Sequence, residues 1–162
     1  MRLSTRGRYA VMAMVELAAR ERSDAEGRTR RQVALADIAQ AQHLSLAYLE
    51  QLFGPLRRAD LVASARGPGG GYRLARPAET ISIAAIVSAV DESIQATRCD
   101  DGGPGCLAGQ RCLTHDLWAE LGQQIHLFLS AVTLADVISG QVQGRAALAN
   151  DRDGPAMRDA AQ

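Results

Sequence analysis

Aromatic residues, cysteines and long apolar stretches are all scarce in this chain of 162 residues. Aromatic residues make up 4% of the chain although hydrophobic residues make up 47%, so we expect helices packed closely through small aliphatic side chains. No apolar run approaches the roughly 18 residues of a membrane-spanning helix, and the start of the chain, MRLSTRGRYA, lacks the hydrophobic region of a signal peptide. We therefore expect a cytoplasmic protein with no membrane partner.

The few cysteines are concentrated in one segment, because Cys99, Cys106 and Cys112 all fall within 14 residues. Three cysteines cannot all pair within one chain. In a reducing compartment, such a cluster of thiols more often binds a metal or acts in redox chemistry than forms a disulfide framework.

Net charge is absent as well, because 18 Lys and Arg side chains balance 18 Asp and Glu side chains. The balance conceals an asymmetry along the chain. Residues 1–76 carry 13 basic and 7 acidic side chains, a net charge of +6, whereas residues 77–162 carry 5 basic and 11 acidic ones. The basic N-terminal part indicates an anionic partner.

The first part of the chain predicts three helices. Residues 5–20 have a helical apolar period with Ser4 or Thr5 as N-cap, and the polar residues 22–32 predict a loop. A short helix follows and stops near residues 41–43, after which Ser45 caps another. The buried stripe of that helix is predicted to contain Leu46, Leu49, Leu52, Phe53, Leu56 and Leu61. The short connection predicts a helix-turn-helix.

The next segment changes from helical to extended patterning. Residues 61–66 and 72–74 predict two strands, and the sequence Gly67-Pro68-Gly69-Gly70-Gly71 between them predicts a turn. A basic hairpin directly after a helix-turn-helix is typical of a winged helix. A phosphate-binding nucleotide loop is the alternative for the glycines, but such loops lead from a strand into a helix.

The last part predicts a helix from Ile83 to Val90, a glycine-rich loop with the cysteines, and a long helix over residues 113–138 that breaks near Thr133 and stops at Gly140. One chain cannot cover the apolar stripe of that helix, so we expect a homodimer. The predicted fold is mainly α with a small β-hairpin wing. We expect a winged helix-turn-helix over residues 1–80, followed over residues 81–140 by the cysteine-bearing loop, a candidate cluster-binding loop, and the dimerisation helix. Residues 141–162 are predicted to form a disordered tail.

The second helix of the helix-turn-helix carries side chains suited to reading double-stranded DNA. If its leucines are buried, the solvent-facing residues are Ala47, Tyr48, Glu50, Gln51, Arg57 and Arg58. Glutamine can pair with adenine, and glutamate can accept a hydrogen bond from cytosine N4. Because a carboxylate is repelled by phosphates, Glu50 is expected to reject unsuitable sites. The alternative is a helical bundle in which Glu50 is simply solvated.

Arginines outside this helix are the candidate backbone contacts. Arg66 at the edge of the wing could enter a narrow minor groove, while Arg73 and Arg76 could neutralise phosphates. Arg6 and Arg8 lie at the unfavourable positive end of the first helix dipole, a cost that a nearby phosphate would reverse. Ordinary exposed arginines are the alternative for these two.

The thiol segment has the pattern Cys99-x6-Cys106-x5-Cys112-x2-His115. Structural zinc sites usually contain two closely spaced ligand pairs, whereas only Cys112 and His115 are so spaced here. Soft thiolates with one imidazole also suit an iron-sulfur cluster, so His115 is a candidate fourth ligand. An ordinary buried or surface histidine is the other interpretation.

Several motifs together resemble the IscR family of iron-sulfur cluster regulators, which are bacterial winged-helix transcription factors. The similarity covers roughly residues 1–140 and includes MRLSTRGRYAV, LADIAQAQHLSLAYLEQLFGPLRRADLV, RGPGGGYRLA, VSAVDES, ATRC and RCLTHDLW. It implies a homodimer that binds promoter operators and carries a 2Fe-2S cluster, supplied by the cluster assembly machinery. The implied cluster ligands are Cys99, Cys106, Cys112 and His115.

The same resemblance implies that residues 45–53, beginning at Ser45, form the recognition helix and that Arg66 is the wing arginine. Glu50 would make the choice of DNA depend on the cluster, and the loaded form would repress genes for cluster assembly. Three features depart from the family pattern: six rather than five residues separate Cys99 from Cys106, Ala47 replaces a common serine, and the arginine-rich segment after the first helix is longer.

Other regulators remain as alternatives at this point. Relatives that sense nitric oxide or iron share the three cysteines but lack the histidine of the CLTH motif, so His115 favours the IscR type. A DNA-binding protein with a structural zinc is a further alternative. An enzyme or redox carrier would need a reactive thiol beside a base and a substrate pocket, and no nucleotide fingerprint or second histidine lies near the thiols. We therefore predict that the chain is not an enzyme.

Overall fold

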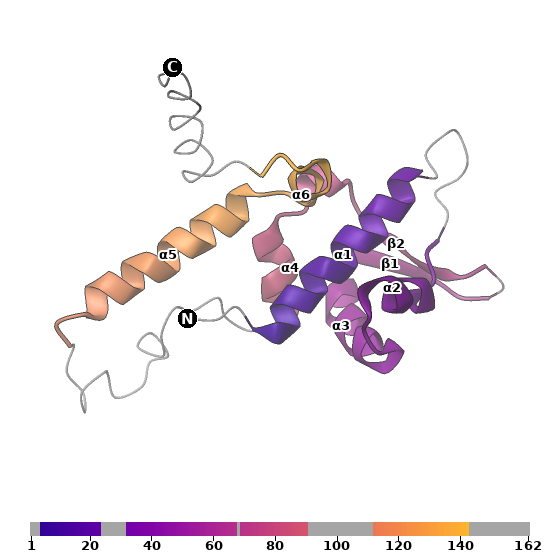
Figure 1. Cartoon of the computed structure of the whole chain (residues 1–162), viewed down its shortest axis with the longest axis horizontal. Helices are drawn as coiled ribbons and strands as arrows, with labels where there is room; N and C mark the ends of the chain where they lie inside the picture. The colour runs from indigo at the N-terminus through magenta and orange to yellow at the C-terminus, as the bar shows by residue number, and fades with distance from the viewer. Residues whose placement is uncertain (1–3, 24–31, 68, 91–111, 143–162) are drawn as a thin grey trace, which may run out of the picture.

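The computed structural model describes residues 4–23, 32–67, 69–90 and 112–142 (Figure 1). The described residues form a mainly helical fold with one antiparallel two-stranded hairpin, as the sequence predicts. In chain order the elements are α1 (Thr5–Ser23), α2 (Leu35–Gln42), α3 (Leu46–Arg58), β1 (Val62–Ala65), β2 (Gly71–Leu74), the short 3-10 helix η1 (Ala78–Thr80), α4 (Ile83–Val90), α5 (His115–Ala131) and α6 (Leu134–Ser139).

Helix α1 runs across the middle of the molecule and packs against α2, α3, α4 and α6 (Figure 1). Its start is capped by Ser4, whose Oγ accepts a hydrogen bond of 2.9 Å from the Gly7 backbone N–H. The core between these helices contains the fully buried side chains of Met14, Leu17, Ile38 and Phe53. Small residues such as Ala10 and Ala13 are also fully buried on α1, so neighbouring helices can approach α1 closely.

The predicted helix-turn-helix is present. Helix α2 ends at His43, which adopts the left-handed conformation with φ of 52°, and the Leu44 N–H donates back to the Ala39 carbonyl at 3.0 Å. Helix α3 then begins after Ser45, whose Oγ accepts a hydrogen bond of 3.2 Å from the Tyr48 N–H. The turn between the two helices is therefore fixed by local hydrogen bonds at both ends.

Strand β2 joins the hairpin to the helical part of the molecule. The hairpin register pairs Val62 with Leu74 and Ala65 with Gly71. An additional bridge, which the sequence did not predict, joins Val33 to Tyr72: each backbone N–H donates to the other residue's carbonyl at 2.8 Å. The Tyr72 ring also packs against Phe53 of α3, with ring centroids 4.8 Å apart. The wing is thus held in a fixed position relative to α2 and α3.

The predicted break in the C-terminal helix occurs at Val132 and Thr133, between α5 and α6. Thr133 and Asp136 form a capping box that starts α6, and Gly140 ends it with φ of 70°. Two backbone hydrogen bonds join this break to the segment before α4: Ile83 N–H donates to Val132 at 2.9 Å, and Leu134 N–H donates to Ile81 at 2.8 Å.

Helix α5 extends away from α1 beyond α4 (Figure 1). Large apolar side chains on it are exposed: Leu117 (61%), Trp118 (40%), Leu121 (37%), Leu127 (52%) and Phe128 (44%). Among the residues that the structure describes, no helix combines the length and hydropathy that crossing a membrane requires. The glycine-rich loop is predicted over residues 91–113, and its residues 91–111 lie outside the described residues, as does the predicted disordered tail apart from residues 141 and 142.

Candidate nucleic-acid interface and metal centre

The exposed face of α3 is formed by residues that the sequence identifies as base-reading candidates. Ala47, Glu50 and Gln51 are exposed, while Leu49 and Leu52 are fully buried on the opposite side. Residues three or four apart lie one above the other on a helix, so these exposed side chains form one strip along α3. Arg57 and Arg58 are exposed in its last turn. This strip combines hydrogen-bonding groups for bases with cations for phosphates.

Two details of the predicted strip are wrong. Leu46, expected in the buried stripe, is 44% exposed, because as the first residue of α3 it precedes the turn that packs on the core. Tyr48, expected to face solvent, is half-buried and packs edge-on against Tyr9 of α1, with ring centroids 6.0 Å apart. Apolar periodicity alone does not show that α1 lies beside this part of α3.

The hairpin arginines occupy different environments. Arg66 is exposed at the end of β1, directly before the glycine turn. Arg73 is half-buried and its Nη1 lies 3.5 Å from the Leu74 carbonyl, whereas Arg76 is exposed just beyond β2. Arg57 of α3 lies 3.5 Å from the Ser64 hydroxyl of β1. Arg57 of α3 therefore lies against the first strand of the wing.

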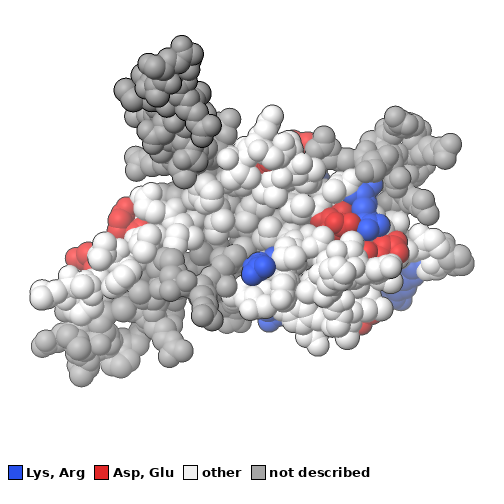
Figure 2. All heavy atoms as spheres, in the orientation of Figure 1, with Lys and Arg blue, Asp and Glu red and all other residues white. Residues whose placement is uncertain are grey.

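Arg6 and Arg8 are both exposed in the first turn of α1. Figure 2 shows basic and acidic side chains together over the part of the molecule formed by α1 to α3 and the hairpin, and acidic side chains at the outer end of α5. Every Lys or Arg of the described residues lies between residues 6 and 76, and α5 has none. The charge asymmetry of the sequence is thus also an asymmetry in space between the winged-helix elements and α5.

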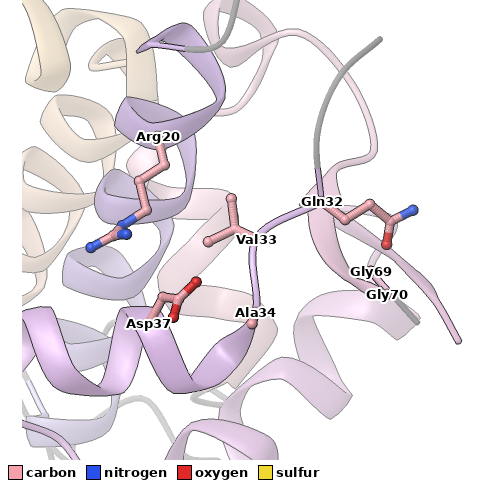
Figure 3. A pocket seen from close by; sticks show the side chains of 7 residues that line it. All are labelled: Arg20, Gln32, Val33, Ala34, Asp37, Gly69 and Gly70. Carbon is pink, nitrogen blue, oxygen red and sulfur yellow. The ribbon is translucent and has the colours of Figure 1, made fainter. Parts of the chain in front are cut away.

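A cavity lies between the end of α1, the start of α2 and the hairpin turn (Figure 3). Arg20 and Asp37 both line it, so its charges are of both signs. Arg20 is already held by Glu16, whose carboxylate is 2.6 Å from Arg20 Nε and accepts a hydrogen bond of 3.0 Å from Gln42. These contacts join α1 to α2, which is a structural role.

Two of the four predicted metal ligands lie among the described residues, and both are at the start of α5. His115 is the first residue of the helix and is 8% exposed, while Cys112 is a half-buried free thiol. The His115 N–H donates to the Cys112 carbonyl at 3.1 Å, and Cys112 Sγ lies 3.4 Å from the Thr114 hydroxyl. The backbone turn places a thiol and an imidazole one helical turn apart.

The chemistry of this donor pair fits the predicted cluster, because thiolate and imidazole are the ligand types that iron-sulfur centres accept. Cys99 and Cys106 lie outside the described residues. Within the described ranges, no group of three or more histidine, cysteine or carboxylate side chains is close enough together to bind a metal ion.

Comparison with known proteins shows the family of the chain. The family model for Rrf2, described as an iron-dependent transcriptional regulator, matches residues 3–140. The chain belongs to the Rrf2 family. The Rrf2 members that it resembles are transcriptional regulators, which confirms the predicted family resemblance and the prediction that the chain is not an enzyme.

Individual Rrf2 relatives agree with this assignment. The HTH-type transcriptional regulator IscR of Yersinia enterocolitica is 50% identical over 141 residues, which cover 87% of this chain and 81% of the relative. The solved structure of CymR, the global cysteine regulator of B. subtilis, has a TM-score of 0.69 at 33% identity and covers 86% of this chain and 97% of that one. T. potens IscR has a TM-score of 0.67 at 32% identity, covering 91% and 96%. The winged-helix fold is thereby confirmed.

Proposed function

We propose that this Rrf2 protein is a cytoplasmic homodimer whose choice of promoter operators is controlled by a 2Fe-2S cluster bound by Cys99, Cys106, Cys112 and His115. The IscR name of relatives at 50% identity supports the cluster. The genes proposed as targets are those for iron-sulfur cluster assembly, whose products would also supply the cluster. A nitric oxide or iron sensor with another cluster is the related alternative.

The observation that carries this proposal is the position of His115 on α5. His115 starts this helix. The chain directly after α5 is joined through the Val132 and Leu134 hydrogen bonds to the start of α4, which packs on α1 of the winged helix. A rigid helix of 17 residues therefore connects the proposed ligand to the part that reads DNA. A change in the surroundings of His115 can alter the orientation of α5 and so favour one of two arrangements of the reading heads.

The ligand residues suit a sensor. A bound 2Fe-2S cluster supplies a redox-active inorganic group whose presence or loss is the signal. Thiolates of the three cysteines are the strong soft donors, whereas a neutral imidazole is displaced by protons more readily. His115 therefore makes the site easier to empty than four thiolates would.

Helix α5 also provides the surface for the proposed dimer. Leu117, Leu121, Ile125 and Phe128 recur at spacings of three or four residues and form one apolar face. Three of these four side chains are exposed in the single chain, and Ile125 is half-buried. A second copy of the helix covers this face and sets the two α3 helices about one turn of DNA apart.

The proposal is tested by footprinting on genomic fragments with anaerobically purified protein, before and after the cluster is removed. Visible iron-sulfur absorbance and different protected fragments for the two forms are expected. A colourless protein with stoichiometric zinc would support a structural metal instead, and identical protection by both forms would overturn cluster control.

Two histidines on α5 offer a matched pair of variants for the same experiment. His115→Ala is expected to weaken cluster retention and to shift the footprint toward that of the stripped protein. His126→Ala, at an exposed position of the same helix, is expected to leave both unchanged. Cys112→Ala provides a second ligand variant because His115 is buried and its replacement also removes packing.

A further inference from the structure

Leu46 is an anomaly in the winged-helix part of the chain. Among the described residues from 4 to 90, it is the single large hydrophobic side chain that is exposed, at 44%. Every other exposed large apolar side chain of the described residues lies between Leu113 and Val142. Leu46 therefore belongs neither to the core nor to the proposed dimer surface, so neither of these gives a reason for a leucine at this position.

Leu46 lies at the end of α3 that supplies the base contacts in helix-turn-helix proteins. It is the first residue of α3, directly after the Ser45 cap, and base contacts of a helix-turn-helix come from the N-terminal part of the second helix. Glu50 follows Leu46 by four residues and lies on the same side of the helix. The adjacent Ala47 is also exposed and apolar. Two apolar side chains thus begin the same strip that carries Glu50 and Gln51.

The major groove offers few partners for an apolar side chain. Bases present hydrogen-bond donors and acceptors there, and among the four standard bases the apolar group is the C5-methyl of thymine. A leucine placed against any polar base edge would desolvate that edge without replacing its hydrogen bonds. Gln51 on the same strip is suited to adenine, the partner of thymine.

We propose that Leu46, with Ala47 beside it, recognises the thymine methyl group and is a specificity-determining residue for A·T pairs in each half-site. This inference rests on the proposed DNA-binding function and adds a base preference to it. Leu46 and Glu50 then divide the recognition: the leucine selects a methyl group and the carboxylate selects a cytosine amino group.

The experiment removes the methyl group and nothing else. Duplexes that bind the full-length, cluster-loaded protein are first selected from a random library, and each thymine of the selected half-site is then replaced by deoxyuridine, which pairs identically. Burial of one methyl group corresponds to about a fourfold effect on affinity. We expect one position per half-site at which deoxyuridine weakens binding by about fourfold.

The same duplexes are measured with Leu46→Ala, which keeps a strong helix former at an exposed position. This variant is expected to bind the thymine and deoxyuridine duplexes with less than a twofold difference. Deoxyuridine in the flanking duplex serves as the control and is expected to have no effect on either protein.

The outcomes separate this inference from the proposed function. Failure to select any duplex would overturn DNA recognition itself. A selected half-site that lacks thymine, or one whose deoxyuridine versions all bind as well as thymine, would refute methyl recognition while leaving DNA binding intact. Equal sensitivity of wild type and Leu46→Ala would show that another residue contacts the methyl group and would overturn the role of Leu46.

Discussion

Replacement of Gly71 by alanine tests how the wing is held against the helices. A Cβ at this position would lie 2.5 Å from the Val33 carbonyl oxygen and 2.7 Å from its carbon, closer than side chains approach backbone atoms. Both contacts are with backbone, so Val33 itself has to move. Val33 and Tyr72 exchange two hydrogen bonds of 2.8 Å, and this movement breaks or lengthens both.

The expected loss of stability follows from these contacts. Two backbone hydrogen bonds contribute about 2 kcal/mol together, and crowding in a packed site adds about 1 kcal/mol or more. The alanine restricts the unfolded chain and returns at most about 1 kcal/mol. Gly71→Ala should therefore lower the free energy of unfolding by about 2 kcal/mol. The wing should also shift and DNA binding should weaken.

Urea unfolding and amide hydrogen exchange measure this effect. We expect faster exchange at the Val33 and Tyr72 amides in Gly71→Ala. Gly69→Ala is the control in the same turn: Gly69 has φ of +76° with no atom within 4 Å of its Cβ position, so alanine there costs about 1 kcal/mol of backbone strain and leaves both amides protected. Wild-type stability and unchanged exchange in Gly71→Ala would refute this explanation of how the wing is anchored.

Four further predictions concern the interfaces and α6. Leu121→Glu should convert the proposed dimer to a monomer in analytical ultracentrifugation. Leu127→Glu is the control, because Leu127 is also exposed but lies about 120° away around α5, on the side of Glu120, so this change should leave the dimer intact. A dimer that survives Leu121→Glu would contradict the proposed interface. Glu50→Ala should reduce discrimination against sites without the cytosine donor by about 1 to 3 kcal/mol in binding titrations, and unchanged discrimination would remove the selector role. Arg66→Ala should weaken binding to all sequences and reduce the slope of log affinity against log salt by about one, so an unaltered slope would mean that Arg66 does not contact phosphates. The Thr133 hydroxyl and the Thr133 backbone N–H both donate hydrogen bonds to the Asp136 carboxylate, and these bonds lower the pKa of that carboxyl. The ionised Asp136 therefore stabilises the fold above the usual carboxyl pKa, and this stabilisation is lost as the pH falls through the lowered pKa. Asp136→Asn should be less stable than wild type at neutral pH and should lose this acid dependence in urea unfolding; a wild-type pH profile in this variant would show that the capping box contributes nothing.

Local features of the fold could be predicted because their causes lie in neighbouring residues. Ser45 followed by an apolar period specifies the start of α3, a run of glycines between extended segments specifies the hairpin, and Thr133 with Asp136 specifies the break before α6. In each case one or two turns of chain contain the donors, acceptors or backbone freedom that determine the structure.

Features that depend on distant residues could not be predicted. Val33 follows a polar segment and directly precedes the start of α2, so it has no strand pattern, yet it pairs with Tyr72. The pattern of α3 alone predicts that Tyr48 faces solvent, but Tyr9 of α1 packs against its ring. At the candidate metal centre, the Cys112 and His115 spacing is local and was identified, whereas the position of Cys99 relative to them depends on chain outside the described residues.

The hydrogen bonds of Ile83 and Leu134 fix the end of α5, so the number of residues in α5 determines how its other end, at His115, is oriented. Each residue of an α-helix adds 1.5 Å of rise and about 100° of rotation. One residue inserted into α5 would therefore turn the Cys112 end of the helix by more than a quarter of a circle relative to the winged helix. In the proposed dimer, the apolar face of α5 would then no longer meet the same face of the partner helix. Natural relatives that keep this signalling geometry should tolerate altered surface residues on α5 far better than altered spacing, and gain or loss of whole heptads should be the least damaging change of length.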